Sequence, residues 1–162
     1  MAKFQVGKGL DEYIALLGNL EFKAPKAIGK AIYKGADIVA DQVRKNIEAL
    51  PVSESKSGSQ GRRNPTQVEK DGLLAGLGIA KKQNDGGYIN VKIGMDGYNA
   101  DVTEKYPKGK PNAMIARSIE SGTTFMRRNP FISKAVRTSK VAAEAAMAAE
   151  LDNQISQIMG KG

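Results

Sequence analysis

The sequence contains few of the residue types that enzymes use for proton transfer or metal binding. It has neither His nor Cys, which excludes imidazole chemistry, thiolate nucleophiles and Cys/His zinc sites. Asp96, Asp101 and Glu104 are near one another in sequence, but their spacing is not that of a calcium loop. No phosphate-binding GxxxxGK[ST] pattern is present. Ser–Lys chemistry is not excluded by composition, but no pattern indicates that a candidate nucleophilic Ser and a Lys base come together in the fold. We therefore expect no catalytic residue, no cofactor and no bound metal.

Basic residues gather in two places, and the chain as a whole carries a net charge of +8. Between Ser121 and Ala143 there is no Asp or Glu, and the cations are Arg127, Arg128, Lys134, Arg137 and Lys140. A second pair is Arg62-Arg63. These seven side chains are candidates for contact with an acidic protein or with DNA phosphates, and ordinary solvated charge explains the C-terminal five equally well. No aromatic residues are interleaved to stack bases, which argues against single-strand binding.

Helical periodicity dominates the N-terminal part of the chain. Residues 9–20 predict a short amphipathic helix through Leu10, Tyr13, Ile14 and Leu17. Pro25 then marks the start of a second, longer helix, because proline is tolerated in the first helical turn. Pro51 ends this helix. Its apolar residues recur at steps of three or four: Ile28, Ile32, Ala36, Val39, Val43 and Ile47.

The middle of the chain predicts a loop followed by a β-hairpin. Residues 53–70 are polar and rich in Gly, Ser and Pro, so they are expected to form an exposed, mobile loop with nothing to bury. Residues 73–79 and 89–95 then alternate between apolar and other side chains. The Asn84-Asp85-Gly86-Gly87 turn between them favours an antiparallel pairing. Residues 98–106 are a candidate edge strand, and residues 107–111 a loop.

Two helical segments follow the hairpin. Asn112 is a candidate cap for a short helix that ends at Gly122, although an extended conformation is an alternative. Asn129-Pro130 supplies a cap and a first-turn proline for a final helix that reaches about Ile158. The apolar residues of that helix are Ile132, Val136, Ala143, Met147, Leu151 and Ile155.

These elements predict an α+β fold. A small antiparallel sheet would pack against the long helix of the N-terminal half and the long C-terminal helix. The 162 residues are expected to form a single domain.

Residues 119–135, IESGTTFMRRNPFISKA, resemble a family of tail-completion, neck or head–tail joining proteins of long-tailed bacteriophages. The shared pattern is an acidic residue before Gly-Thr, a short loop, then Pro-Phe opening the C-terminal helix with an Ala near its first turn. The residues that match are Glu120, Gly122, Thr123, Pro130, Phe131 and Ala135. The order of the other elements is also similar, but relatives lack the long polar insertion at residues 53–70.

The resemblance implies a structural protein rather than an enzyme. It implies a homo-oligomeric ring, commonly a hexamer, at the end of the tail that faces the head, in contact with neighbouring tail or head-connector proteins. The expected location is the virion tail or neck, and the host cytoplasm during assembly, since residues 1–10 do not read as a signal peptide and no segment is long and apolar enough to span a membrane. The alternative is a basic accessory protein that contacts DNA non-specifically.

Overall fold

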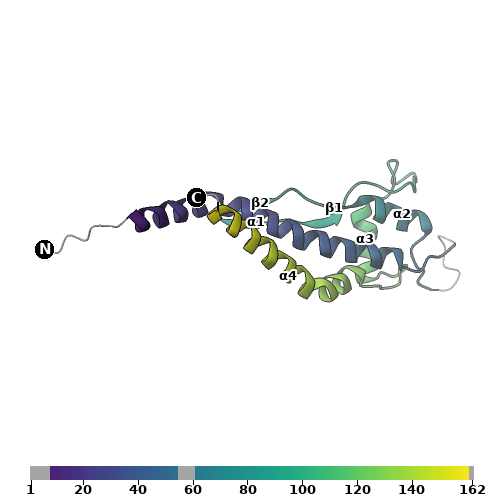
Figure 1. The fold of residues 1–162 in the computed structure, drawn as a ribbon. Coiled ribbons are helices and arrows are strands. Elements are labelled where there is room, and N and C mark those ends of the chain that lie inside the picture. Colours follow the sequence, from purple (N-terminus) through teal and green to yellow (C-terminus); the bar gives the residue numbers. More distant parts are fainter. Residues whose placement is uncertain (1–7, 55–60, 161–162) are drawn as a thin grey trace.

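In a computed structural model the chain forms an elongated α+β fold built on two long antiparallel helices (Figure 1). The structure describes residues 8–54 and 61–160, and of residues 8–17 it describes the backbone alone. The long helices are α1 (Lys8–Glu48) and α4 (Phe131–Gly160). Two short helices, α2 (Gln67–Gly76) and α3 (Asn112–Ser121), lie at the end of the pair where α1 stops and α4 begins. The predicted α+β class is confirmed.

Helix α1 is continuous, so the predicted division into two helices near Pro25 is wrong. Proline inside a helix removes one backbone hydrogen bond and costs about 3 kcal/mol. Burial beyond this point offsets that cost, since Ala27, Ala31 and Ala36 are all buried. The predicted end before Pro51 is confirmed, and Leu50 packs into the core after the last turn.

Small side chains let α1 and α4 lie close together. On α1 the buried positions include Gly35, where an added Cβ would fall 2.6 Å from the Met147 side chain of α4. On α4 the buried positions are Phe131, Ala135, Ser139, Ala143 and Ile158. This corrects the predicted apolar face of α4, because Val136 is largely exposed and only Ala143 of the six predicted residues is fully buried.

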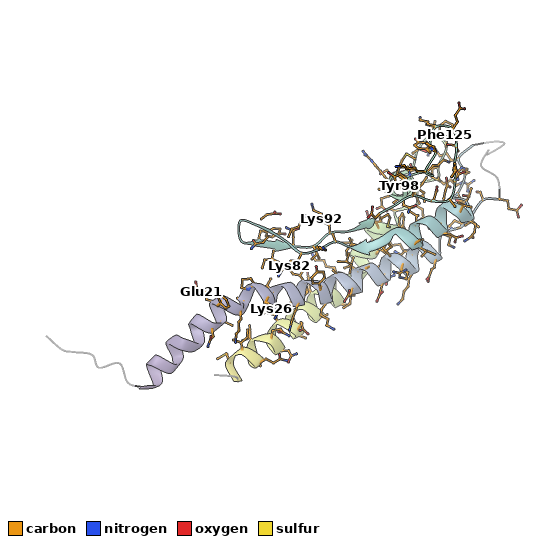
Figure 2. All side chains as sticks on the ribbon, turned by 90° about the horizontal axis from the view of Figure 1, so that it is seen from above. Glu21, Lys26, Lys82, Lys92, Tyr98 and Phe125 are labelled. Atoms are coloured by element: carbon orange, nitrogen blue, oxygen red, sulfur yellow. The ribbon has the colours of Figure 1, made fainter. Side chains whose placement is uncertain are left out.

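The predicted hairpin is confirmed, but its pairing is split into two short ladders. Strand β1 (Leu77–Ile79) pairs with β4 (Ile93–Met95), and β2 (Gln83–Asp85) pairs with β3 (Tyr88–Asn90), both antiparallel. A single backbone hydrogen bond from Ala80 to Lys92 spans the gap between the ladders. Strands β1 and β3 both contact α1, which therefore lies between the hairpin and α4 (Figure 2).

Helix α2 occupies residues that the sequence assigned to the end of the loop and the start of the first strand. It begins at Gln67 rather than continuing as loop to residue 70, and it holds Leu73, which is fully buried. The alternation from residue 73 was misleading because it includes glycines that serve close packing. An added Cβ on Gly76 would lie 2.3 Å from the Asp96 carbonyl oxygen. Residues 55–60 of the predicted loop lie outside the described residues.

Two smaller predictions around α3 are also corrected. Residues 98–106 form no strand, and Tyr98 makes only an isolated bridge to Pro111. The helix predicted from Asn112 is present, but its N-cap residue is Pro111. The Asn112 side chain instead donates a hydrogen bond to the Asp96 carbonyl, 2.8 Å away.

The main core lies at the α2–α3 end and joins all four helices to β4. Its fully buried large side chains are Val43, Ile47, Leu73, Ile119 and Phe131. Among the helices in the described part of the chain, none combines the length and hydropathy needed to cross a membrane.

The position of Ile47 in this core predicts the effect of its truncation. Ile47 is 0% exposed, so Ile47→Ala should lower the free energy of unfolding by about 2–5 kcal/mol. Ile28→Ala is the matched control, because Ile28 lies on the same helix and is 37% exposed. Urea denaturation followed by circular dichroism measures both. Equal losses in the two variants would contradict the assigned core.

Candidate functional site

Glu120, the acidic residue of the segment 119–135, caps the last helix. The Glu120 carboxylate, at the end of α3, accepts hydrogen bonds from the backbone N–H groups of Ile132 at 2.8 Å and Ser133 at 2.9 Å. It also accepts one from the Ser133 hydroxyl. These are first-turn groups of α4, where negative charge is favoured by the helix dipole. The capping role that the sequence assigned to Asn129 is thus filled here by a carboxylate from another helix.

Gly122 and Thr123 turn the chain between α3 and α4. Gly122 has φ +74°, and an added Cβ would lie 2.9 Å from the Arg128 side chain. The Thr123 hydroxyl accepts hydrogen bonds from the N–H groups of Phe125 and Met126, at 3.2 and 2.9 Å. The turn buries Met126 and leaves Phe125 78% exposed.

The remaining motif residues fix the start of α4 on α1. Pro130 precedes the helix, while Phe131 and Ala135 are buried in the main core. The Phe131 carbonyl accepts a hydrogen bond of 2.9 Å from the Asn46 side chain of α1. The structure therefore brings all six motif residues together at one junction of α1, α3 and α4.

The seven candidate cations do not form one surface of equivalent groups. Arg62, Arg127, Arg128, Lys134, Arg137 and Lys140 are exposed. Arg127 also donates a hydrogen bond to the Arg62 carbonyl, so the two basic segments meet. Arg63 is different, because its guanidinium is held by Glu69 and only 12% of its side chain is exposed. The prediction that Arg63 contacts an acidic partner conflicts with this internal pairing.

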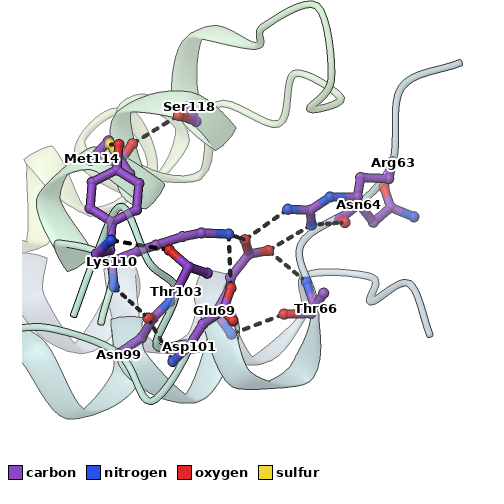
Figure 3. A network of polar contacts seen from close by, with 11 residues as sticks. Arg63, Asn64, Thr66, Glu69, Asn99, Asp101, Thr103, Lys110, Met114 and Ser118 are labelled. Atoms are coloured by element: carbon purple, nitrogen blue, oxygen red, sulfur yellow. Dashed lines mark hydrogen bonds and ion pairs between the residues drawn. The ribbon is translucent and has the colours of Figure 1, made fainter. Parts of the chain in front are cut away.

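Arg63 belongs to a buried ionic cluster that the sequence reading missed (Figure 3). Its two terminal nitrogens donate to the two carboxylate oxygens of Glu69, at 2.6 and 2.7 Å. The Lys110 ammonium lies 3.8 Å from Glu69 and 2.8 Å from Asp101. Asn99 supports the cluster by accepting hydrogen bonds from the N–H groups of Asp101 and Lys110. The cluster joins the segment before α2 to the loop before α3.

Glu69 also closes a capping box at the start of α2. Its carboxylate accepts a hydrogen bond from the Thr66 N–H, and the Thr66 hydroxyl accepts one from the Glu69 N–H. The signal was present in the sequence as Thr66-x-x-Glu69, the spacing typical of this motif. It was obscured by the polar residues around it, which indicated a loop.

Hydrogen bonding sets the ionisation of Glu69. Burial by itself would raise the pKa of the Glu69 carboxyl. The Arg63 hydrogen bonds, the Thr66 N–H and the charges of Arg63 and Lys110 together hold the pKa below its ordinary value of 4.5. The Glu69 carboxylate in turn raises the pKa of Arg63. Both groups therefore stay charged at neutral pH, and the pair acts as a structural link between two loops and a helix.

The carboxylates of Asp96, Asp101 and Glu104, which are near one another in sequence, do not form a cation site. Asp101 is paired with Lys110, whereas Asp96 and Glu104 are exposed. Among the side chains that the structure describes, in residues 18–54 and 61–160, no group of three acidic residues is arranged to hold a metal ion.

Comparisons with protein-family models, curated proteins and solved structures find no match to this chain. The resemblance carried by residues 119–135 therefore remains a prediction.

The Glu69 pair predicts a pH-dependent contribution to stability. Glu69→Gln should lower the free energy of unfolding at pH 7 by about 1.5–3 kcal/mol, the value of hydrogen bonds to charged groups. Because the folded pKa is lowered, this contribution is complete above pH 4.5 and is lost as the pH falls through the lower, folded value. Urea unfolding should thus show that the difference in free energy of unfolding between wild type and variant is smaller at about pH 3 than at pH 7. Glu48→Gln, an exposed change of the same kind, is the control, and a gap independent of pH would contradict the assignment.

The hydrogen bonds from the start of α4 to Glu120 predict that removing this carboxylate lowers the stability of the protein. Glu120→Ala should destabilise the protein by about 0.5–2 kcal/mol, as removal of a helix cap does. Glu144→Ala, which removes an exposed carboxylate on α4, should change stability by less than about 0.5 kcal/mol. Thermal unfolding of both variants provides the comparison, and equal shifts would argue against a capping role.

Proposed function

We propose that this chain is a structural subunit of a long-tailed bacteriophage, a tail-completion or head–tail joining protein that forms a homo-oligomeric ring at the tail–neck interface. The sequence resemblance supplies the family, and the structure gives its motif a purely architectural use. Glu120, Thr123 and Phe131 cap, turn and anchor the α3–α4 junction. No step of this role requires a reacting group.

The observation that carries the proposal is exposed aromatic surface at two separate places on an elongated molecule. The described part of the chain contains three phenylalanines, and two are mostly exposed: Phe22 at 87% and Phe125 at 78%. Figure 2 shows Phe125 at the end of the molecule where α1 stops, whereas Phe22 directly follows Glu21, which lies in the N-terminal half of α1. Exposed aromatic side chains are the typical anchors of protein interfaces.

The location of these anchors favours a repeating assembly. Two different contact surfaces on one subunit can join copies head to tail, and such contacts close into rings when the rotation allows it. The buried carboxylates of Glu69 and Asp101 are both paired with cations of the same chain in the α2–α3 region, so their charges serve the fold of the subunit.

Deletion of the gene from the phage that carries it tests the proposal. Electron microscopy of lysates should show separate DNA-filled heads and completed or overlong tails, because the joining subunit is missing. Supplying the wild-type gene in trans should restore joined particles, which controls for effects on neighbouring genes. Normal joined particles in the deletion lysate would exclude the joining role.

A further inference from the structure

A groove with an apolar floor and a basic rim lies where α1 leaves the end of α4. It has a volume of about 600 Å3. Its floor includes Ala27 of α1 and Ile158 of α4, and Phe22 forms one wall. Four ammonium groups surround this apolar surface: Lys23, Lys26, Lys30 and Lys82.

The walls of the groove are held in place by contacts between separate elements. The Lys30 ammonium donates a hydrogen bond of 3.1 Å to Gln154 of α4. On the other side, the Lys82 backbone N–H donates to the Tyr33 hydroxyl at 2.7 Å, which fixes the hairpin to α1. The Lys82 side chain then runs over Gly29, where an added Cβ would lie 2.8 Å from its stem. Figure 2 shows Lys82 and Lys26 beside the same part of α1.

The chemistry of the groove defines what would fill it. Four of its ten lining residues are lysines and none is acidic. Nearly all of Phe22 is in contact with solvent, so covering it removes apolar surface from water. The matching occupant is a helix with an apolar face flanked by carboxylates.

Residues 10–21 of this same chain have that composition. The sequence LDEYIALLGNLE holds Asp11, Glu12 and Glu21 and no Lys or Arg. Its apolar residues Leu10, Tyr13, Ile14 and Leu17 recur at helical spacing, and the backbone is helical from Lys8 onward. This local charge of −3 contrasts with +8 for the whole chain.

The course of α1 requires a second molecule for the contact. Because α1 continues unbroken through Pro25, residues 10–21 lead away from the groove of their own chain. Figure 1 shows the first part of α1 extending beyond the C-terminal end of α4. Twelve helical residues span about 18 Å, enough to reach into an adjacent copy.

We propose that the acidic, apolar segment 10–21 of α1 docks into the lysine-rimmed groove between α1, α4 and the hairpin of a second copy of this chain. The inference rests on the proposed homo-oligomeric function and names the contact that would build it. Ion pairs with the lysines orient the segment, and burial of Phe22, which is 87% exposed, supplies the apolar contact. In a head-to-tail ring, each subunit would place its segment 10–21 in the groove of one neighbour and receive the segment of the other neighbour in its own groove.

A charge-exchange series on the full chain tests this contact. Lys23→Glu with Lys26→Glu reverses the rim, and Asp11→Lys with Glu12→Lys reverses the docking segment. Each pair should weaken self-association at least about tenfold, because opposite charges become like charges across the contact. The four changes together should restore most of the wild-type affinity. Lys34→Glu with Lys45→Glu, exposed and outside the groove, is the matched control and should have little effect.

Sedimentation velocity over a concentration series measures these affinities, and circular dichroism checks that helix content is unchanged. A wild-type oligomer that neither reversal weakens would refute the docking while leaving the proposed ring intact. A wild type that is monomeric at every concentration would count against both proposals. Loss of double-stranded DNA binding in the Lys23/Lys26 variant with an unchanged oligomer would assign the groove to nucleic acid instead, and so overturn the proposal.

The absence of native Cys allows a second measurement that does not depend on charge. A Leu17→Cys protein mixed with a Gln157→Cys protein should form a disulfide-linked pair of the two chains under mild oxidation. Differently sized tags would distinguish this product from pairs of one variant. Failure to form the mixed pair, with both variants folded and oligomeric, would refute the contact.

Discussion

The contact between α1 and α4 sets the position of every other element. Many of the buried side chains on the two helices are small, and at Gly35 the missing Cβ leaves room for the Met147 side chain of α4. Small side chains bury little apolar area per residue, and the length of the two helices compensates for this. The same arrangement limits the core, because most of the large buried side chains, such as Ile47 and Phe131, lie at one end. The fold is consequently long and thin rather than layered around a broad sheet.

A thin fold of this kind needs polar links to order its irregular segments. At the α2–α3 end two carboxylates provide them: Glu69 holds Arg63 and the start of α2, and Glu120 holds the start of α4. In both interactions a carboxylate accepts hydrogen bonds from N–H groups. Without it, these donors would bond to water or stay unpaired in the protein. The loops here are therefore defined by specific hydrogen bonds, while apolar packing fixes the helices that they connect.

The distribution of unburied surface follows from the same geometry. When the core is confined to one end, aromatic residues elsewhere lack partners within the chain, and Phe22 is the clearest example. A head-to-tail assembly covers such surface without enlarging the subunit. This connects the exposed aromatic surface to the proposed role as a ring-forming virion component, and it gives the basic groove beside Phe22 a use within that ring.

The sequence by itself determined the features that depend on local periodicity and turn chemistry. It predicted the apolar face through Val43 and Ile47, the hairpin and the extent of the last helix, because these follow from side-chain spacing and backbone preference. Only the tertiary structure decided whether α1 continues through Pro25, because packing against α4, which is distant in sequence, offsets the backbone hydrogen bond that proline removes. It also decided the pairing of Arg63 with Glu69. From the sequence alone, an arginine in a polar segment looks the same whether its guanidinium is solvated or paired with a buried carboxylate. Only the packing of the loop before α3 against this segment shows that Arg63 is paired.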